Sequence, residues 1–195
     1  YRQAIRYYTR AISLRSTSAS FFYNRGIAYE GLRMYERAIQ DYDRAISVDS
    51  RKSEAYSRRG SAFTALRQYQ RAIEDYGQAI GINPHDTSNY LNRGVAFLLS
   101  GLADAAASDE RKYLGAEGWR TQASPFAALV GHYSYRQAGN TTAAREILNE
   151  AATRCDATAW PYPVIRYLRR EITAQALLGA ATGEKTKLTE VHAYI

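Results

Sequence analysis

The sequence repeats itself at a fixed interval, because the spacing from Gly26 to Gly60 is the same as the spacing from Gly60 to Gly94. Other small and aromatic residues recur with these glycines. These further columns are Tyr29 with Phe63 and Phe97, Ala38 with Ala72 and Ala106, and Ala45 with Ala79. A fixed period of this length is typical of a solenoid, whose stacked units bury apolar surface between neighbours. We therefore predict a repeat scaffold, in which added length adds units and does not enlarge one central core.

Each period contains two stretches in which apolar residues recur with the spacing of an amphipathic helix. The predicted hairpins are Ala19–Leu32 with Tyr35–Val48, Ser53–Leu66 with Tyr69–Ile82, and Thr87–Leu99 with Ala103–Leu114. Pro84 cannot continue a helix, so it separates the second hairpin from the third, whose N-cap we expect at Asp86 or Thr87. A single helix over Tyr1–Leu14 matches the second helix of a pair, so we expect the chain to be a fragment that begins in mid-repeat.

These columns resemble the tetratricopeptide repeat (TPR), a helix–turn–helix unit of about 34 residues. The similarity covers residues 1–114 and includes the glycine–x–x–aromatic step of the first helix and the alanine–aromatic–alanine pattern of the second. It implies an all-α fold of antiparallel helix hairpins, stacked as a solenoid in a right-handed superhelix. In this family the inner groove, lined mainly by the first helices, holds a peptide or a partner helix. On this basis we assign a half repeat to residues 1–18 and full repeats to residues 19–52, 53–86 and 87–120.

The repeat phase slips after Leu114. We predict a loop in the run GAEGWRTQAS, which holds two glycines, followed by a degenerate TPR hairpin over residues 121–158. Its helices are expected at Pro125–Gln137 and Thr141–Arg154. His132 takes the position that glycine holds in the other hairpins, so we expect looser packing there.

The last part, residues 159–195, is predicted to form short helices at Pro163–Arg169 and Thr173–Ala181, followed by the start of a further repeat at Lys187–Ile195. The runs WPYPVIRYLRREIT and LTEVHAY resemble the C-terminal half of NlpI-like bacterial repeat lipoproteins, a similarity that covers residues 119–195. The resemblance implies a bacterial origin and an adaptor role at the cell envelope. The sequence leaves the compartment unknown, with two alternatives open: the cytoplasm, or the periplasm where a lipoprotein signal lies upstream.

The first helices supply the candidate binding site. In the TPR family, the positions one turn before the glycine column face the groove, and here these are Asn24, Arg58 and Asn92. The full set of predicted partner-binding residues is Tyr23, Asn24, Ile27, Glu30, Glu54, Ser57, Arg58, Ser61, Leu91, Asn92, Val95 and Leu98. Because this set becomes apolar towards the third repeat, we expect a peptide with a polar start and an apolar end.

Two alternatives stay open for this groove. Asn24 and Arg58 match a pattern with which chaperone-binding members grip a carboxylate, but Glu54 stands where a lysine is expected and would repel that group. The apolar residues of the third repeat, Leu91 and Val95 among them, are otherwise explained if the fourth hairpin or a second chain covers them.

The net charge of +7 is concentrated in the N-terminal repeats. Residues 1–83 carry 14 Lys/Arg and 8 Asp/Glu, whereas residues 84–195 carry 12 and 11. Either this excess is a solvated helical surface whose arginine stems cover aromatic rings, or it attracts an acidic partner. Nucleic acid is disfavoured as a partner because no reading motif accompanies the scattered basic residues.

The predicted function is therefore a non-enzymatic protein–protein interaction scaffold or adaptor that binds a peptide or a partner protein in the TPR groove. Two alternatives remain. One is a structural, self-assembling module that forms a homodimer, and the other is a bacterial envelope adaptor of the NlpI type.

Two further columns are charged. Arg25, Arg59 and Arg93 precede the glycines, and an aspartate follows each of them at a constant spacing, at Asp41, Asp75 and Asp109. We predict that each arginine pairs with its aspartate across the hairpin or with the adjacent unit; two independent surface charges are the alternative. Arg33 and Arg67 occupy a turn position usually held by glycine, where a left-handed conformation would cost about 1 kcal/mol each.

No catalytic, metal or cofactor site is predicted. The three histidines, His85, His132 and His192, share no metal-ligand spacing, and a single cysteine excludes an internal disulfide. Cys155 and His132 fall on the two helices of one hairpin, so a catalytic dyad is conceivable, but no orienting acid accompanies them. We therefore interpret Cys155 as a structural thiol. No apolar run approaches the ~20 residues of a transmembrane helix.

Overall fold

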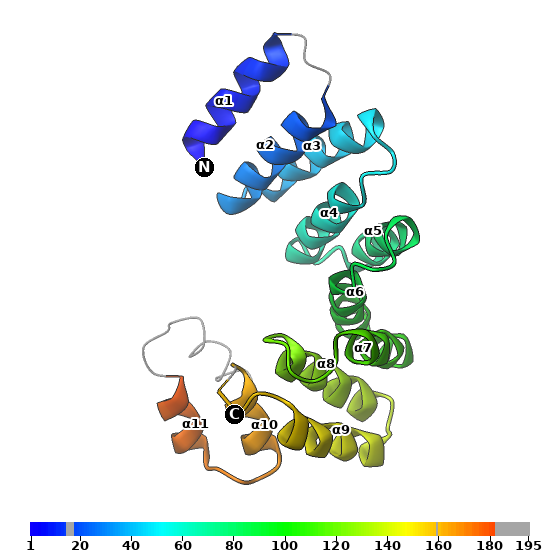
Figure 1. The fold of residues 1–195 in the computed structure, drawn as a ribbon, viewed down its shortest axis with the longest axis vertical. Helices are drawn as coiled ribbons and strands as arrows, with labels where there is room; N and C mark the ends of the chain where they lie inside the picture. Colours follow the sequence, from blue (N-terminus) through cyan, green and yellow to red (C-terminus); the bar gives the residue numbers. More distant parts are fainter. Residues whose placement is uncertain (15–17, 159, 182–195) are drawn as a thin grey trace. The chain divides into compact units, whose positions relative to one another are not determined.

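The structure, a computed structural model, describes residues 1–14, 18–158 and 160–181. These residues form α-helices without β-strands, which confirms the predicted all-α fold of helix hairpins (Figure 1). The helices are α1 (Arg2–Ser13), α2 (Ala19–Gly31), α3 (Tyr35–Val48), α4 (Ser53–Ala65), α5 (Tyr69–Ile82), α6 (Ser88–Leu99), α7 (Ala103–Glu117), α8 (Ser124–Gln137), α9 (Thr141–Arg154), α10 (Tyr162–Leu168) and α11 (Ala174–Ala180). The helix predicted at 187–195, with His192, lies outside the described residues.

The helix limits agree closely with the sequence prediction, with one exception. Helices α3, α5 and α9 begin and end at the predicted residues. The predicted end of α7 at Leu114 was wrong, because this helix continues through Gly115 to Glu117. The chain leaves it at Gly118, whose φ of 78° is left-handed. A glycine inside a helix costs only about 1 kcal/mol, which packing of the helix can offset.

The chain forms two compact units, Tyr1–Ser100 and Gly101–Ile195. In the first unit, each helix from α1 to α5 packs against the next one in the sequence, which ends with α6 (Figure 1). In the second unit, α8 packs against both α7 and α9, and α10 contacts α8, α9 and α11. The division falls between α6 and α7, within the third predicted repeat.

Close helix contact in the first unit depends on glycines that face tyrosines. Gly26 on α2 lies against the ring of Tyr42 on α3, and a Cβ added at Gly26 would lie 2.6 Å from a ring carbon. Gly60 faces Tyr76 in the same way, with a corresponding distance of 3.1 Å. Tyr42 is completely buried. The aromatic ring therefore fills the space that the absent side chain leaves, at the close packing typical of protein interiors.

The predicted arginine–aspartate pairs are confirmed in the two hairpins of the first unit. Arg25 donates two hydrogen bonds of 2.7 Å to the carboxylate of Asp41, and Arg59 donates two of 2.8 and 2.7 Å to Asp75. Both aspartates are buried. Arg93 and Asp109 belong to different units, and their pairing stays a prediction.

Arg25 and Arg59 also contact the preceding repeat. Arg25 donates to the hydroxyl of Thr9 on α1 at 3.1 Å, and Arg59 forms an ion pair with Asp43 on α3. Thr9 and Asp43 hold the same place in the repeat. The hydrogen bonds to Asp75 and then to Asp43 raise the pKa of Arg59 above its ordinary value. A single guanidinium thus joins its own hairpin to its neighbour, which explains why this position is cationic.

Two arginines hold left-handed turns between paired helices, at positions where the sequence has them in place of the usual glycine. The φ angles are 58° at Arg33 and 59° at Arg67. After the second of these turns the N–H of Gln68 donates to the carbonyl of Phe63 at 2.8 Å, closing the end of α4. Glycine would adopt this conformation without steric cost, so each arginine stores local strain.

In the hairpin α8–α9, the glycine position holds a larger residue and the tyrosine position a smaller one than in the first unit. His132 takes the place of the glycine, and Leu148 takes the place that Tyr42 and Tyr76 hold in the first unit. The imidazole is buried, and its Nδ1 lies 2.7 Å from the carbonyl oxygen of Ala144. The larger residue at the glycine position is accommodated because the facing residue is smaller.

Glu110 of α7 also stands in the tyrosine column. It is completely buried and lies against Gly131 of α8, where an added Cβ would be 2.9 Å from the carboxyl carbon. Neither carboxyl oxygen has a hydrogen-bond partner in the part of the chain that the structure describes. Burial therefore raises the pKa of Glu110 from 4.5 to about 8, because the charged form is poorly solvated there.

Candidate functional site

A cavity of about 340 Å³ in the first unit crosses three first helices of successive hairpins. Its lining comes from α2, α4, the start of α6 and the loop before α6, which places it where the repeat pattern predicts a groove. The lining residues are Tyr23, Glu54, Ser57, Arg58, Ser61, Asp86, Ser88 and Asn92. We refer to this cavity as the first-unit groove.

Half of the predicted partner-binding set lines this groove, namely Tyr23, Glu54, Ser57, Arg58, Ser61 and Asn92. The other predicted residues do not line it, namely Asn24, Ile27, Glu30, Leu91, Val95 and Leu98. Leu91 is only 7% exposed, and Val95 and Leu98 are half-buried. The described cavity is therefore mainly polar, and the apolar end that we expected for it lies outside its lining.

Two lining residues were missed by the sequence prediction, Asp86 and Ser88. Both follow from the period, because Ser88 stands one repeat after Glu54 and Asp86 stands one repeat after Lys52. The carboxylate of Asp86 accepts hydrogen bonds from the Ser88 hydroxyl at 2.6 Å and from the Asn89 amide at 3.1 Å. It therefore orders the first turn of α6 while it faces the groove.

Glu30 supports the groove from behind although it does not line it. The hydroxyl of Tyr42 donates to one oxygen of Glu30 at 2.7 Å, and Arg58 Nη1 lies 3.6 Å from the other. Burial, and then this hydrogen bond, raise the pKa of Tyr42, so its hydroxyl stays protonated as a donor. The carboxylate thus links the packed core to Arg58, which lines the groove.

The aromatic side of the groove is formed by Tyr23. Its ring lies 6.0 Å from that of Tyr42, at a tilt of 48°. The ammonium group of Lys52 lies 4.9 Å from the centre of the Tyr23 ring, within the range of a cation–π contact. These contacts hold the ring in place, so the side chain loses little conformational freedom when a ligand binds.

The groove combines charges of both signs. Glu54 and Asp86 are acidic, whereas Arg58 is basic and its side chain is 48% exposed. Ser57, Ser61 and Asn92 add neutral donors and acceptors. Such a lining can bind the N–H and C=O groups of an extended peptide together with charged side chains.

Cys155 and His132, for which a dyad was conceivable and a structural role was preferred, each have a defined environment in the structure. His132 donates through Nδ1 to the Ala144 carbonyl, and its Nε2 has no hydrogen-bond partner among the described residues. Burial raises the pKa of Cys155 to about 11, so the thiol is not ionised at neutral pH. The described residues contain no group of three His, Cys, Asp or Glu side chains that could hold a metal ion. Within the same ranges, no helix combines the length and hydropathy that crossing a membrane requires.

Comparison with known proteins gives the same family as the repeat period. A family model for the tetratricopeptide repeat matches residues 19–52 and 53–86, the limits of two predicted repeats. No match was found among curated proteins.

The solved structures that share the fold include the following three. A crystal structure of MamA is 21% identical, covers 76% of this chain and 85% of its own, and gives a TM-score of 0.71. YrrB, described as a TPR protein with an unusual peptide-binding site, is 20% identical, with coverage of 88% and 84% and a TM-score of 0.72. The first TPR of Spaghetti (RPAP3), bound to the HSP90 peptide SRMEEVD, is 23% identical, with coverage of 59% and 91% and a TM-score of 0.55. At these identities the likeness shows the fold.

Proposed function

This chain is a tetratricopeptide repeat protein, and we propose that it is an interaction scaffold that binds a peptide segment of a partner protein in the first-unit groove. TPR repeats are in general non-enzymatic interaction modules, and two structural neighbours are described with a peptide or a peptide-binding site. The observation that carries the proposal is the continuous polar cavity across α2, α4 and α6.

The charges of the groove indicate the chemistry of the segment. Glu54 and Asp86 favour a basic or amide-bearing residue of the partner, while Arg58 favours an acidic residue or a carbonyl oxygen. Tyr23 offers a ring face to an apolar or cationic side chain. We therefore propose a segment of mixed charge. A purely acidic partner stays a prediction from the net charge of the N-terminal repeats.

A peptide-display selection tests this function. The wild-type chain serves as bait, and the selected peptides are measured against a groove variant, Tyr23→Ala/Arg58→Ala/Asn92→Ala. We expect the affinity of the selected peptides to fall by at least about tenfold, which is about 1.4 kcal/mol. Selection of no peptide, or equal affinity for the groove variant and the wild type, would contradict the proposal.

A matched control changes exposed residues on second helices, Gln40→Ala/Arg44→Ala/Gln78→Ala. This control removes the same number of polar side chains outside the groove, so the peptides should bind it with wild-type affinity. Far-ultraviolet circular dichroism of both variants verifies that the helices are retained.

The alternative of a self-assembling module is tested separately. Light scattering coupled to size-exclusion chromatography across a concentration range gives the mass of the particle. A tight dimer over Val95 and Leu98, the half-buried members of the predicted apolar set, would favour the structural role. The envelope adaptor of the NlpI type stays a prediction from the C-terminal residues.

A further inference from the structure

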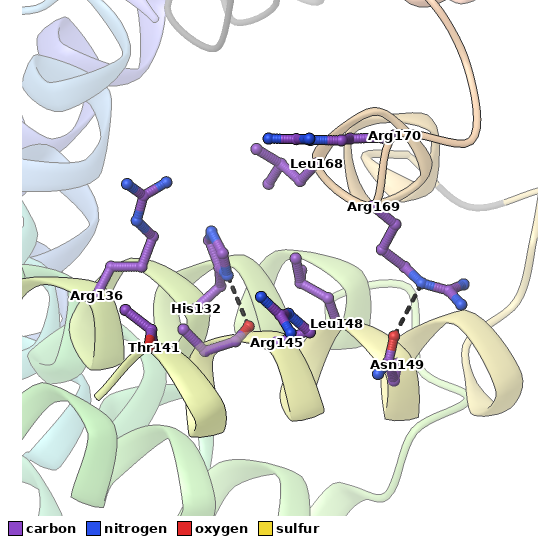
Figure 2. A pocket seen from close by; sticks show the side chains of 10 residues that line it. His132, Arg136, Thr141, Arg145, Leu148, Asn149, Leu168, Arg169 and Arg170 are labelled. Atoms are coloured by element: carbon purple, nitrogen blue, oxygen red, sulfur yellow. Dashed lines mark hydrogen bonds between the residues drawn. The ribbon is translucent and has the colours of Figure 1, made fainter. Parts of the chain in front are cut away.

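The second unit contains a larger cavity, of about 560 Å³, between the hairpin α8–α9 and the end of α10. Figure 2 shows its side chains rising from both helices of the hairpin towards Leu168 and Arg170. Its lining residues are His132, Arg136, Thr141, Ala144, Arg145, Leu148, Asn149, Leu168, Arg169 and Arg170. We refer to it as the arginine pocket. It lies within the second unit alone and shares no residue with the first-unit groove.

The charged residues that line the arginine pocket are all basic. Four arginines line the pocket, and none of the lining residues is acidic. Arg169 is already engaged, because it donates to Asn149 at 3.1 Å and forms an ion pair with Glu171 at 2.6 Å. Within the described ranges, Arg136 and Arg145 have no hydrogen-bond or ion-pair partner, and neither does the side chain of Arg170. Like charges gathered around one cavity repel each other, and a bound anion would relieve that repulsion.

His132 adds a second, independent sign of a ligand. The residue is 7% exposed, so it is more than nine-tenths buried. A carbonyl oxygen only accepts, so Nδ1 carries the proton that is donated to Ala144. The second ring nitrogen lies on the side away from Ala144, towards the pocket (Figure 2), and has no hydrogen-bond partner among the described residues. Burial, and to a lesser extent Arg136, lower the pKa of His132, so the neutral ring offers a lone pair at this nitrogen.

A ligand that complements this pocket must therefore carry two different chemical groups. The arginines require an anion, whereas the free nitrogen of His132 requires a hydrogen-bond donor. A buried polar atom left without a partner is destabilising, and a bound hydrogen-bond donor would remove that cost. A peptide supplies both groups, because a backbone N–H stands next to each aspartate or glutamate carboxylate.

The size and the apolar wall of the pocket agree with a peptide. Leu148 and Leu168 both line it, so part of the wall can bury an aliphatic side chain. Its volume lies in the range of about 300–1,000 Å³ that holds ligands much larger than a single phosphate. We infer that the second unit carries its own recognition site, the arginine pocket, which binds an acidic peptide segment with an aliphatic residue beside its carboxylates.

The test is an NMR titration of the whole chain with two synthetic probe peptides, acetylated and amidated, one of sequence LEELEEL and one of sequence LQQLQQL. We expect the acidic peptide to shift the side-chain signals of Arg136, Arg145 and the imidazole nitrogens of His132. The glutamine peptide should bind at least about tenfold more weakly, because it keeps the size and the leucines but carries no charge.

Three variants locate the binding. The double variant Arg136→Gln/Arg145→Gln removes two unpaired cations. It should lower the affinity for the acidic peptide by at least about tenfold. Arg120→Gln makes the same kind of change at an exposed residue of the same unit outside the pocket, and should leave the affinity unchanged. Arg58→Gln, in the first-unit groove, should also leave it unchanged, so failure of this site is distinguishable from failure of the proposed function.

Three results would overturn the inference. The first is equal affinity of the wild type for the two peptides. The second is equal affinity of the double variant and the wild type for the acidic peptide, and this includes the case in which neither protein binds it. The third is binding of inorganic phosphate alone with the affinity of the acidic peptide, which would show a simple anion site. Retention of the helical circular dichroism spectrum in the double variant verifies that lost affinity does not reflect unfolding.

Discussion

The guanidinium of Arg59 donates two hydrogen bonds to the carboxylate of Asp75, with N···O distances of 2.8 and 2.7 Å. Burial of Asp75 disfavours its charged form and raises its pKa, and the bonds from Arg59 oppose that shift. The same arginine reaches Asp43 of the preceding hairpin. Arg59 therefore has two roles. It supplies hydrogen bonds to the buried carboxylate of Asp75, and it connects two neighbouring repeats through Asp43.

Asp75→Asn should destabilise the protein by about 3 kcal/mol, because it removes the buried partner of Arg59 and leaves the guanidinium only the exposed carboxylate of Asp43. The measurement is urea unfolding followed by circular dichroism. Glu74→Gln is the matched control, since Glu74 is the exposed neighbour on the same helix and its change should stay within about 0.5 kcal/mol. Equal effects of the two substitutions would show that the Arg59–Asp75 pair contributes nothing specific.

Replacement of the turn arginines by glycine should stabilise the chain. Arg33→Gly and Arg67→Gly each remove a residue held at positive φ, and each should raise the free energy of unfolding by about 1 kcal/mol. Arg44→Gly places the same substitution inside α3, and it should lower the free energy of unfolding by about 1 kcal/mol. Thermal unfolding of the three variants gives the comparison, and a loss of stability at position 33 or 67 would contradict it.

The glycine–tyrosine contact predicts an asymmetry between two alanine substitutions. Gly26→Ala should destabilise by about 1–3 kcal/mol, because its Cβ would collide with the buried ring of Tyr42. Gly81→Ala meets nothing within 4 Å, so it should instead stabilise α5 by about 0.5–1 kcal/mol. In the double variant Gly26→Ala/Tyr42→Leu, the smaller leucine removes the collision, as Leu148 does opposite His132. The double variant should therefore lose less unfolding free energy than the sum of the losses in Gly26→Ala and Tyr42→Leu.

Glu110 should make stability fall as pH rises. Its folded pKa of about 8 lies above the ordinary value of 4.5, so the folded state holds the proton more tightly than the unfolded state. The contribution is complete below about pH 4.5 and is lost as pH rises to about 8, with a slope near 1.4 kcal/mol per pH unit. Urea unfolding of the wild type and Glu110→Gln across this window isolates the effect. A difference between the two proteins that is constant with pH would contradict it.

Much of the fold could be predicted from the sequence because its determinants are local and periodic. Glycine, alanine and tyrosine columns recur in each period, so the hairpins and the Arg25–Asp41 pair follow from alignment alone. The same alignment shows Glu110 in the tyrosine column, but only the structure shows that its oxygens lack partners among the described residues. The end of α7 was missed because Gly115 suggested a break that packing overrides.

The candidate sites were harder to predict because they depend on side-chain directions. Leu91 belongs to the predicted groove set, yet it is buried and offers little to a ligand. Asp86 and Ser88 were missed although they continue the columns of Lys52 and Glu54. The arginine pocket joins the hairpin α8–α9 to Arg169 and Arg170 after α10, which lie outside the repeat columns, so the repeat pattern does not indicate it.

The most direct test of the proposed function is photo-cross-linking of a display-selected peptide to the chain. A photoreactive amino acid is placed in turn at Ser57 and Asn92, which line the groove, and at Gln40 and Gln78, which are exposed on second helices. Binding in the first-unit groove predicts cross-links from the two groove positions and none from the two control positions. Cross-links from the control positions alone would place the peptide elsewhere and contradict the account.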